Sequence, residues 1–80
     1  MKKLELLTDD QRDKRQFVKR HIKGLMKALD PDIVSVGYNI TYDDVEYVII
    51  KRKNGTVKRV NVTGDSLFSV TRDVISSLYI

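Results

Sequence analysis

Hydrophobic positions along residues 9–29 recur with the period of an α-helix. Thr8 and Gln11 have the spacing of a capping box, and Asp30-Pro31 ends the segment because proline disfavours a helical conformation in the preceding residue. Wound at about 100° per residue, the segment gathers seven apolar side chains on one arc: Phe17, Val18, Ile22, Leu25, Met26, Ala28 and Leu29. The pattern predicts one helix over 9–29 that turns this arc toward a core.

The middle of the chain alternates apolar and polar residues with the period of a β-strand. We expect strands at 33–42, 45–53 and 56–62, joined by two-residue turns at Asp43-Asp44 and Asn54-Gly55. With those turns, the inward face carries Tyr38, Ile40, Tyr47, Ile49, Val60 and Val62, and all four tyrosines of the chain point inward. The outward face then carries Ser35, Gly37, Asn39, Glu46, Val48, Ile50, Arg52, Val57, Arg59 and Asn61.

Residues 65–79 have weak helix propensity but helical spacing of apolar side chains. The spaced positions are Leu67, Val70, Thr71, Val74, Ile75, Leu78 and Tyr79. We expect a helix held by packing, with a strand as the alternative. The order of elements predicts an α+β fold of one domain over residues 1–80. It is α-β-β-β-α, a three-stranded antiparallel meander with both helices packed on one face.

The composition excludes several classes of catalytic and metal-binding site. The 80 residues contain no cysteine and one histidine, which excludes disulfides, thiolate zinc sites and a cysteine nucleophile. We expect no enzyme, no metal site and no cofactor. His21 is interpreted as a partly buried core residue. The acidic group of Asp43, Asp44 and Glu46 has oxygen ligands that could hold a cation, but we interpret it as a solvated turn.

The net charge of +4 is carried by the first thirty residues, which hold nine Lys and Arg against five Asp and Glu. One basic group lies on the predicted helix, opposite its apolar arc: Arg12, Lys19, Arg20, Lys23 and Lys27. A second surrounds the predicted hairpin tip, with Lys51, Lys53 and Lys58. If both groups face the same way, they favour contact with nucleic-acid phosphates; the alternative is a pair of solvated surfaces.

The predicted outward sheet face is more apolar than a solvated face requires, because of Val48, Ile50 and Val57. Arg52 and Arg59 would add oriented charge beside them. This pattern favours a protein-binding patch formed by these five residues, or a homodimer interface. The alternative is that β-branched residues are present for their strand propensity alone.

The element order, length and positive charge resemble a double-stranded-RNA-binding domain over residues 9–79. That family binds phosphates with lysines at the start of its second helix, where this chain has 64–68, Gly-Asp-Ser-Leu-Phe. The family also has a Gly-Pro-x-His loop after its first strand, where this chain has Asp43-Asp44. Both departures affect the binding residues, so the resemblance implies the topology and not RNA binding.

The segments MKKLELLTDDQRDKR and VIIKRKNGTVKRVNV resemble small accessory proteins of phages and mobile elements. Such proteins act by binding, and the resemblance implies an inhibitor or modulator that docks a host protein such as a defence nuclease. We therefore expect a non-enzymatic binding protein, with a small basic DNA- or RNA-binding protein as the alternative. No segment has the pattern of a membrane span or secretory signal, so we expect a cytoplasmic protein without a membrane partner.

Overall fold

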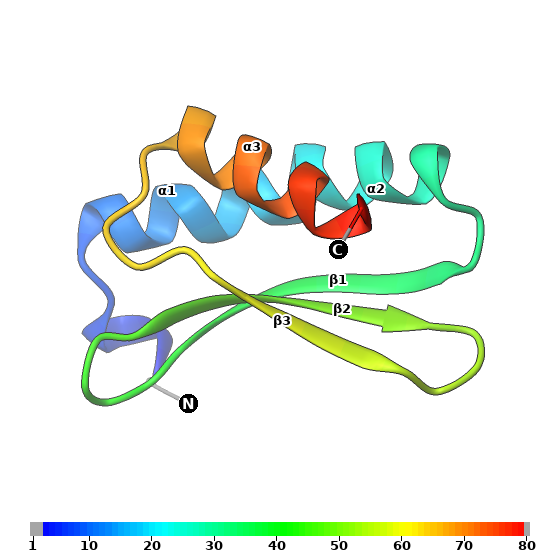
Figure 1. The fold of residues 1–80 in the computed structure, drawn as a ribbon. Coiled ribbons are helices and arrows are strands. Elements are labelled where there is room, and N and C mark those ends of the chain that lie inside the picture. Colours follow the sequence, from blue (N-terminus) through cyan, green and yellow to red (C-terminus); the bar gives the residue numbers. More distant parts are fainter. Residues whose placement is uncertain (1–2, 80) are drawn as a thin grey trace.

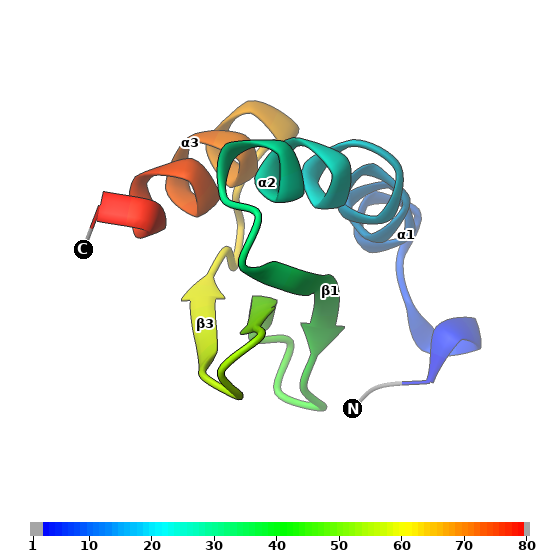
Figure 2. The same cartoon turned by 90° about the vertical axis from the view of Figure 1, so that its right-hand side faces the viewer.

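The computed structural model describes residues 3–79 and has two layers, helices on one side and a three-stranded antiparallel sheet on the other (Figure 1). The strands are β1 (Ile33–Ile40), β2 (Glu46–Arg52) and β3 (Val57–Asn61), in the order β1-β2-β3. One long helix and α3 (Leu67–Ser76) cover the same face of this sheet (Figure 2). The predicted α+β fold and element order are confirmed.

The long helix runs from residue 9 to residue 29, as predicted. It consists of α1 (Asp9–Phe17), a π turn (Val18–Ile22) and α2 (Lys23–Leu29). Thr8 and Gln11 form the expected capping box: the Gln11 N–H donates to Thr8 Oγ1 at 3.2 Å and the Thr8 N–H to Gln11 Oε1 at 3.0 Å. The capping residues therefore define where the helix begins.

The π turn explains which side of this helix is buried. The buried positions Lys14, Val18, Ile22 and Met26 are each four residues apart. Four residues overrun a turn of 3.6 by roughly 40°, so the buried row would drift around a regular α-helix. The π turn between Val18 and Ile22 is wider and absorbs part of this drift. The predicted arc was too broad: Leu25, Ala28 and Leu29 lie exposed.

Both hairpin loops contain three residues rather than the expected two. In the first, the Thr41 N–H donates to the Val45 carbonyl and the Asp44 N–H to the Thr41 carbonyl, each at 3.0 Å. The second loop closes in the same way between Arg52 and Thr56. In each loop the last residue has a positive φ, 62° at Asp44 and 85° in the second loop. This is the three-residue loop in which a left-handed residue follows a tight turn.

The longer loops turn β2 over relative to the prediction. Tyr38 lies opposite Val48, and Val48 opposite Val60. A shift of one position between β1 and β2 turns the side chains of β2 to the opposite face of the sheet. A second shift between β2 and β3 returns the side chains of β3 to their predicted face. The inward placement of Tyr38, Ile40, Val60 and Val62 was therefore correct, whereas that of Tyr47 and Ile49 was wrong. Glu46, Val48 and Ile50 are the residues of β2 that face the helices.

The C-terminal segment is helical, as expected. Helix α3 begins after Ser66, whose hydroxyl accepts the Ser69 N–H at 3.2 Å, and a 3₁₀ turn (Ser77–Tyr79) follows it. Val70 and Val74 are fully buried and hold the helix to the core, in place of intrinsic propensity. No helix within residues 3–79 is long and apolar enough to cross a membrane.

Candidate functional site

The sheet face opposite the helices is bare within residues 3–79, as the lower side of Figure 1 shows. We call it the uncovered face, and the strand pairing assigns its residues: Ser35, Gly37, Asn39, Tyr47, Ile49, Lys51, Val57, Arg59 and Asn61. Tyr47 and Ile49 occupy the central strand and are half-buried, and Val57 is 50% exposed beside them. Lys51 and Arg59 are the charged residues of this face, and both are exposed.

Two residues of the predicted protein-binding patch lie in the core instead. Val48 is 0% exposed and Ile50 is 1% exposed, because the three-residue loops turn them toward the helices. Arg52 also faces inward and forms a hydrogen-bonded ion pair with Asp30 after the long helix. Val57 and Arg59 do lie on the uncovered face. The apolar centre of this face is therefore Tyr47 and Ile49, which the sequence prediction had placed inside.

The uncovered face is hollowed beside Gly37. A depression of about 200 Å³ opens there, lined in part by Asn39, Ile49 and Lys51. Gly37 lies opposite Ile49 and has no side chain to fill the space, and a Cβ atom there would meet nothing within 4 Å. The Asn39 Oδ1 atom is enclosed and accepts no hydrogen bond from the described residues. The hollow offers room for a side chain of a partner.

The predicted basic groups do not merge into one surface. The helix residues Arg12, Lys19, Arg20, Lys23 and Lys27 are all exposed, as expected. Of the hairpin residues, Lys51 lies on the uncovered face and Lys53 is exposed at the loop. Lys58 faces inward and donates to the carbonyl of Ser77 near the end of α3. The helix group and the exposed hairpin residues thus lie on different layers of the fold.

A row of cations follows the side of the long helix that borders β1. Arg12 and Arg15 line a hollow of about 410 Å³ together with Glu5. Arg15 and Lys19 line the adjoining hollow of about 180 Å³ along the edge of β1. Arg15 was absent from the predicted basic group. The sequence carried a signal for it, because 12, 15 and 19 have the spacing of one helix face.

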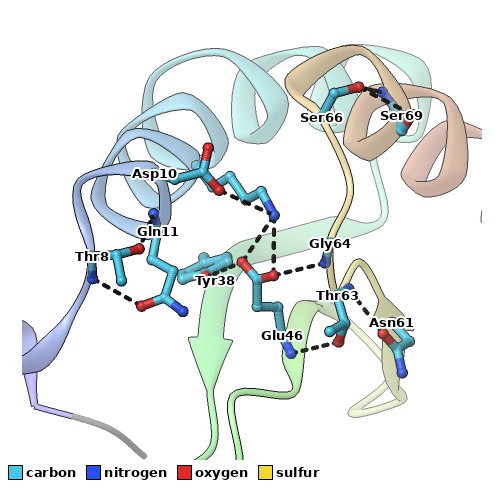
Figure 3. Close-up of polar contacts among 11 residues, drawn as sticks. Thr8, Asp10, Gln11, Tyr38, Glu46, Asn61, Thr63, Gly64, Ser66 and Ser69 are labelled. Carbon is cyan, nitrogen blue, oxygen red and sulfur yellow. Dashed lines mark hydrogen bonds and ion pairs between the residues drawn. The ribbon is translucent and has the colours of Figure 1, made fainter.

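The centre of the polar chemistry is Glu46, which is 4% exposed (Figure 3). Its carboxylate accepts hydrogen bonds from Lys14 Nζ at 3.0 and 3.1 Å, the Tyr38 hydroxyl at 2.6 Å and the Gly64 N–H at 3.0 Å. Its own N–H donates to Thr63 Oγ1 at 2.9 Å. The cluster ties the long helix, β1, β2 and the segment before α3 together.

Electrostatics fix the charge states in this cluster. Burial alone would raise the pKa of Glu46, but the hydrogen bonds from Tyr38, Gly64 and Lys14 outweigh it and hold that pKa below its usual value. Burial first, and then the hydrogen bond to Glu46 and its negative charge, raise the pKa of Tyr38 far above its usual range. The hydrogen bonds that this buried carboxylate accepts hold the surrounding elements together.

Several residues expected inside are exposed. Tyr42 and Tyr79 are exposed, and Tyr47 lies on the uncovered face, so only Tyr38 confirms the prediction of inward tyrosines. His21 is exposed and packs its ring against Phe17, with centroids 5.4 Å apart. The acidic group at 43–46 is also divided, because Glu46 points into the core. Within residues 3–79, no three His, Asp or Glu side chains are placed to hold a metal ion.

No protein-family model matches the chain, and no match is found among curated proteins or solved structures.

Proposed function

We propose that this chain is a non-enzymatic binding protein that docks a partner protein on its uncovered face. The observation that carries the proposal is the position of Tyr47 and Ile49 in the central strand, next to the exposed Val57. A sheet face in contact with water alone is normally polar. Aromatic and aliphatic side chains at the centre of a face, with charged groups at the rim, are the composition of a protein interface.

The polar surroundings support the same proposal. Lys51 and Arg59 border the apolar centre and would orient a partner with acidic groups. The hollow beside Gly37 would receive one side chain of that partner. The resemblance to accessory proteins of phages and mobile elements extends the proposal to a host protein as the partner, with inhibition or modulation as the result.

The proposal is tested by capture from cells that naturally produce the chain, followed by titration of the purified captured protein. The variants Tyr47→Ala and Val57→Asp each remove apolar contact from the uncovered face and should weaken binding by about tenfold or more. Leu29→Asp changes an exposed apolar residue of α2 and serves as the control. Equal binding by all variants contradicts the proposal. Light scattering that shows a dimer of wild type, lost in Val57→Asp, would instead make this face a homodimer interface.

A second candidate function is single-stranded nucleic-acid binding on the same face. The sequence prediction placed no aromatic residue among the basic residues of this face, but Tyr47 lies there with Lys51 and Arg59. An aromatic ring on an open sheet between cations is the usual platform for a stacked base. The basic group on the long helix lies on the other layer and would not contribute to this platform.

The two candidates differ in salt dependence. Binding of a labelled oligonucleotide should fall steeply with salt concentration if Lys51 and Arg59 contact phosphates. Tyr47→Ala should weaken it more than Tyr47→Phe, because phenylalanine retains the ring for stacking. Absence of binding at low salt would exclude the nucleic-acid candidate and leave the protein-docking proposal intact.

A further inference from the structure

The edge strand β1 has one side that no strand of residues 3–79 covers. The bond from the Thr41 N–H to the Val45 carbonyl identifies the first hydrogen-bonded pair of the β1–β2 hairpin. Such pairs alternate along an antiparallel ladder, so Asn39 and Gly37 also direct their backbone groups toward β2. The residues between them must direct theirs the other way.

Those residues are Val36, Tyr38 and Ile40, whose N–H and carbonyl groups point away from the sheet at its open edge. Their side chains are buried beneath the helices, which holds the strand in place. The edge is reachable from both layers: one hollow lies on the helix side of Gly37 and another on the uncovered face. Because glycine has no side chain, the middle of this edge is open. An edge of this kind is a template for an added strand.

The charged residues that line the two hollows beside Gly37 are all cations. Arg15 and Lys19 line the hollow on the helix side, and Lys51 lines the hollow on the other side. Within residues 3–79, neither Arg15 nor Lys19 has an ion-pair partner. Glu5 is the single acidic residue lining these three hollows in the described chain, and it lies in the hollow shared by Arg12 and Arg15.

The spacing of two of these cations matches a strand. Arg15 and Lys19 are four residues apart, which is about 6 Å along a helix. Alternate residues of a strand point to the same side and lie roughly 6.6 Å apart. The long helix packs along β1, so the row of cations follows the direction that an added strand would take (Figure 1). Two acidic residues separated by one position would therefore meet Arg15 and Lys19 together.

A second copy of this chain fits the edge poorly. Pairing β1 with β1 of another copy would bring two sets of Arg15 and Lys19 to one seam, in a protein whose net charge is already +4. Like charges placed together at an interface oppose association. The charge pattern selects a partner of opposite sign.

We propose that the open edge of β1 binds an extended acidic peptide segment of a partner protein as a fourth strand, with carboxylates at alternate positions pairing with Arg15 and Lys19. Backbone hydrogen bonds to Val36 and Tyr38 give the affinity, and the two cations select the sequence. This surface shares Lys51 and the hollow beside Gly37 with the proposed docking surface but does not include Val57 of β3, so a change at Val57 distinguishes the two.

The test uses fluorescence polarisation with a labelled peptide that alternates Val and Glu. The full chain should bind it, and the double variant Arg15→Glu/Lys19→Glu should weaken binding by about tenfold or more. The matched control Lys23→Glu/Lys27→Glu makes the same change of charge on exposed residues of α2 that line none of these hollows. Val57→Asp should leave peptide binding unchanged, which separates this inference from the proposed function.

Strand addition itself is tested with N-methylated peptides. Alternate N–H groups of an added strand point toward β1, and the others point away from it. Methylation of the amides that point toward β1 should abolish binding. Methylation of the other set should be tolerated. A peptide of the same composition with its glutamates adjacent should bind at least about tenfold more weakly. Equal binding of all peptides would reduce the interaction to unspecific charge attraction and overturn the proposal. So would absence of binding, or a wild-type dimer that the peptide does not dissociate.

Discussion

The hydroxyl of Tyr38 donates a 2.6 Å hydrogen bond to Glu46 Oε1, and both residues are buried. The bond crosses from β1 to β2 and is one of four that reach this carboxylate through its side-chain oxygens. A buried carboxylate is costly unless all its neighbours donate to it. The donors around Glu46 therefore offset the free-energy cost of burying its carboxylate. If one donor is lost, part of that cost is no longer offset and the fold is destabilised.

Removal of the charge at Glu46 should destabilise the fold strongly. Glu46→Gln removes the buried carboxylate from Lys14 and leaves it with the exposed Asp10 alone, at 3.8 Å; breaking a buried ion pair costs about 3–5 kcal/mol. Tyr38→Phe removes one hydrogen bond and should cost about 1–3 kcal/mol. The double variant Lys14→Met/Glu46→Gln should recover much of the first loss because no unpaired charge remains. Urea denaturation measures all three; a Glu46→Gln protein as stable as wild type would contradict the structure.

Stability should fall at both ends of the pH range. The pKa of Glu46 is depressed in the folded state, so its contribution is present above the unfolded value of about 4.3 and is lost as pH falls through the folded value. The pKa of Tyr38 is raised, so its contribution is present below about 10 and is lost as pH rises further. Melting temperatures recorded against pH should show a flatter acid limb in Glu46→Gln and a flatter alkaline limb in Tyr38→Phe.

Three consecutive residues of β2 should respond in alternation to alanine substitution. Val48→Ala and Ile50→Ala create cavities in the core, and we expect a loss of about 2–4 kcal/mol for Ile50→Ala. Ile49→Ala changes a half-buried residue of the uncovered face and should cost about 1 kcal/mol or less. The two-residue turns would give the reverse order, so the free energies of unfolding decide between the two registers.

The second hairpin loop depends on a left-handed residue at Gly55. Gly55→Ala places a side chain at a φ of 85° and should destabilise the fold by roughly 1–2 kcal/mol. A Cβ there meets no atom within 4 Å, so the cost comes from the backbone alone. A chemically synthesised chain with D-alanine at this position should regain the lost stability, because a D-residue favours positive φ. Equal destabilisation by both alanines would indicate a different loop.

The helices could be predicted from local signals. Thr8 and Gln11 define the start of the long helix, and Asp30-Pro31 its end. These signals are strong because each depends on residues within one turn of the helix. The π turn could not be predicted from helix propensity. The related sequence signal is the four-residue spacing of the buried positions from Lys14 to Met26. Because the first of these positions is a lysine, the row was not recognised as apolar.

The sheet register could not be predicted, because it depends on loop length. Asn54-Gly55 favours a two-residue turn, but here the loop takes in Lys53 as well. In the first loop the left-handed residue is Asp44, and an aspartate does not predict a positive φ as a glycine does. The same error in both loops kept the two predicted pairings consistent with each other. Their agreement therefore did not test either loop, and β2 alone was placed on the wrong face.

The donors around Glu46 have a consequence for how the chain folds. Lys14 and Gly64 are separated by fifty positions, and both must reach one carboxylate. Long-range contacts of this kind carry a large loop-closure cost and tend to form late. We expect the cluster to be incomplete in the folding transition state. Its loss should then accelerate unfolding much more than it slows folding, so that Glu46 sets the lifetime of the native state.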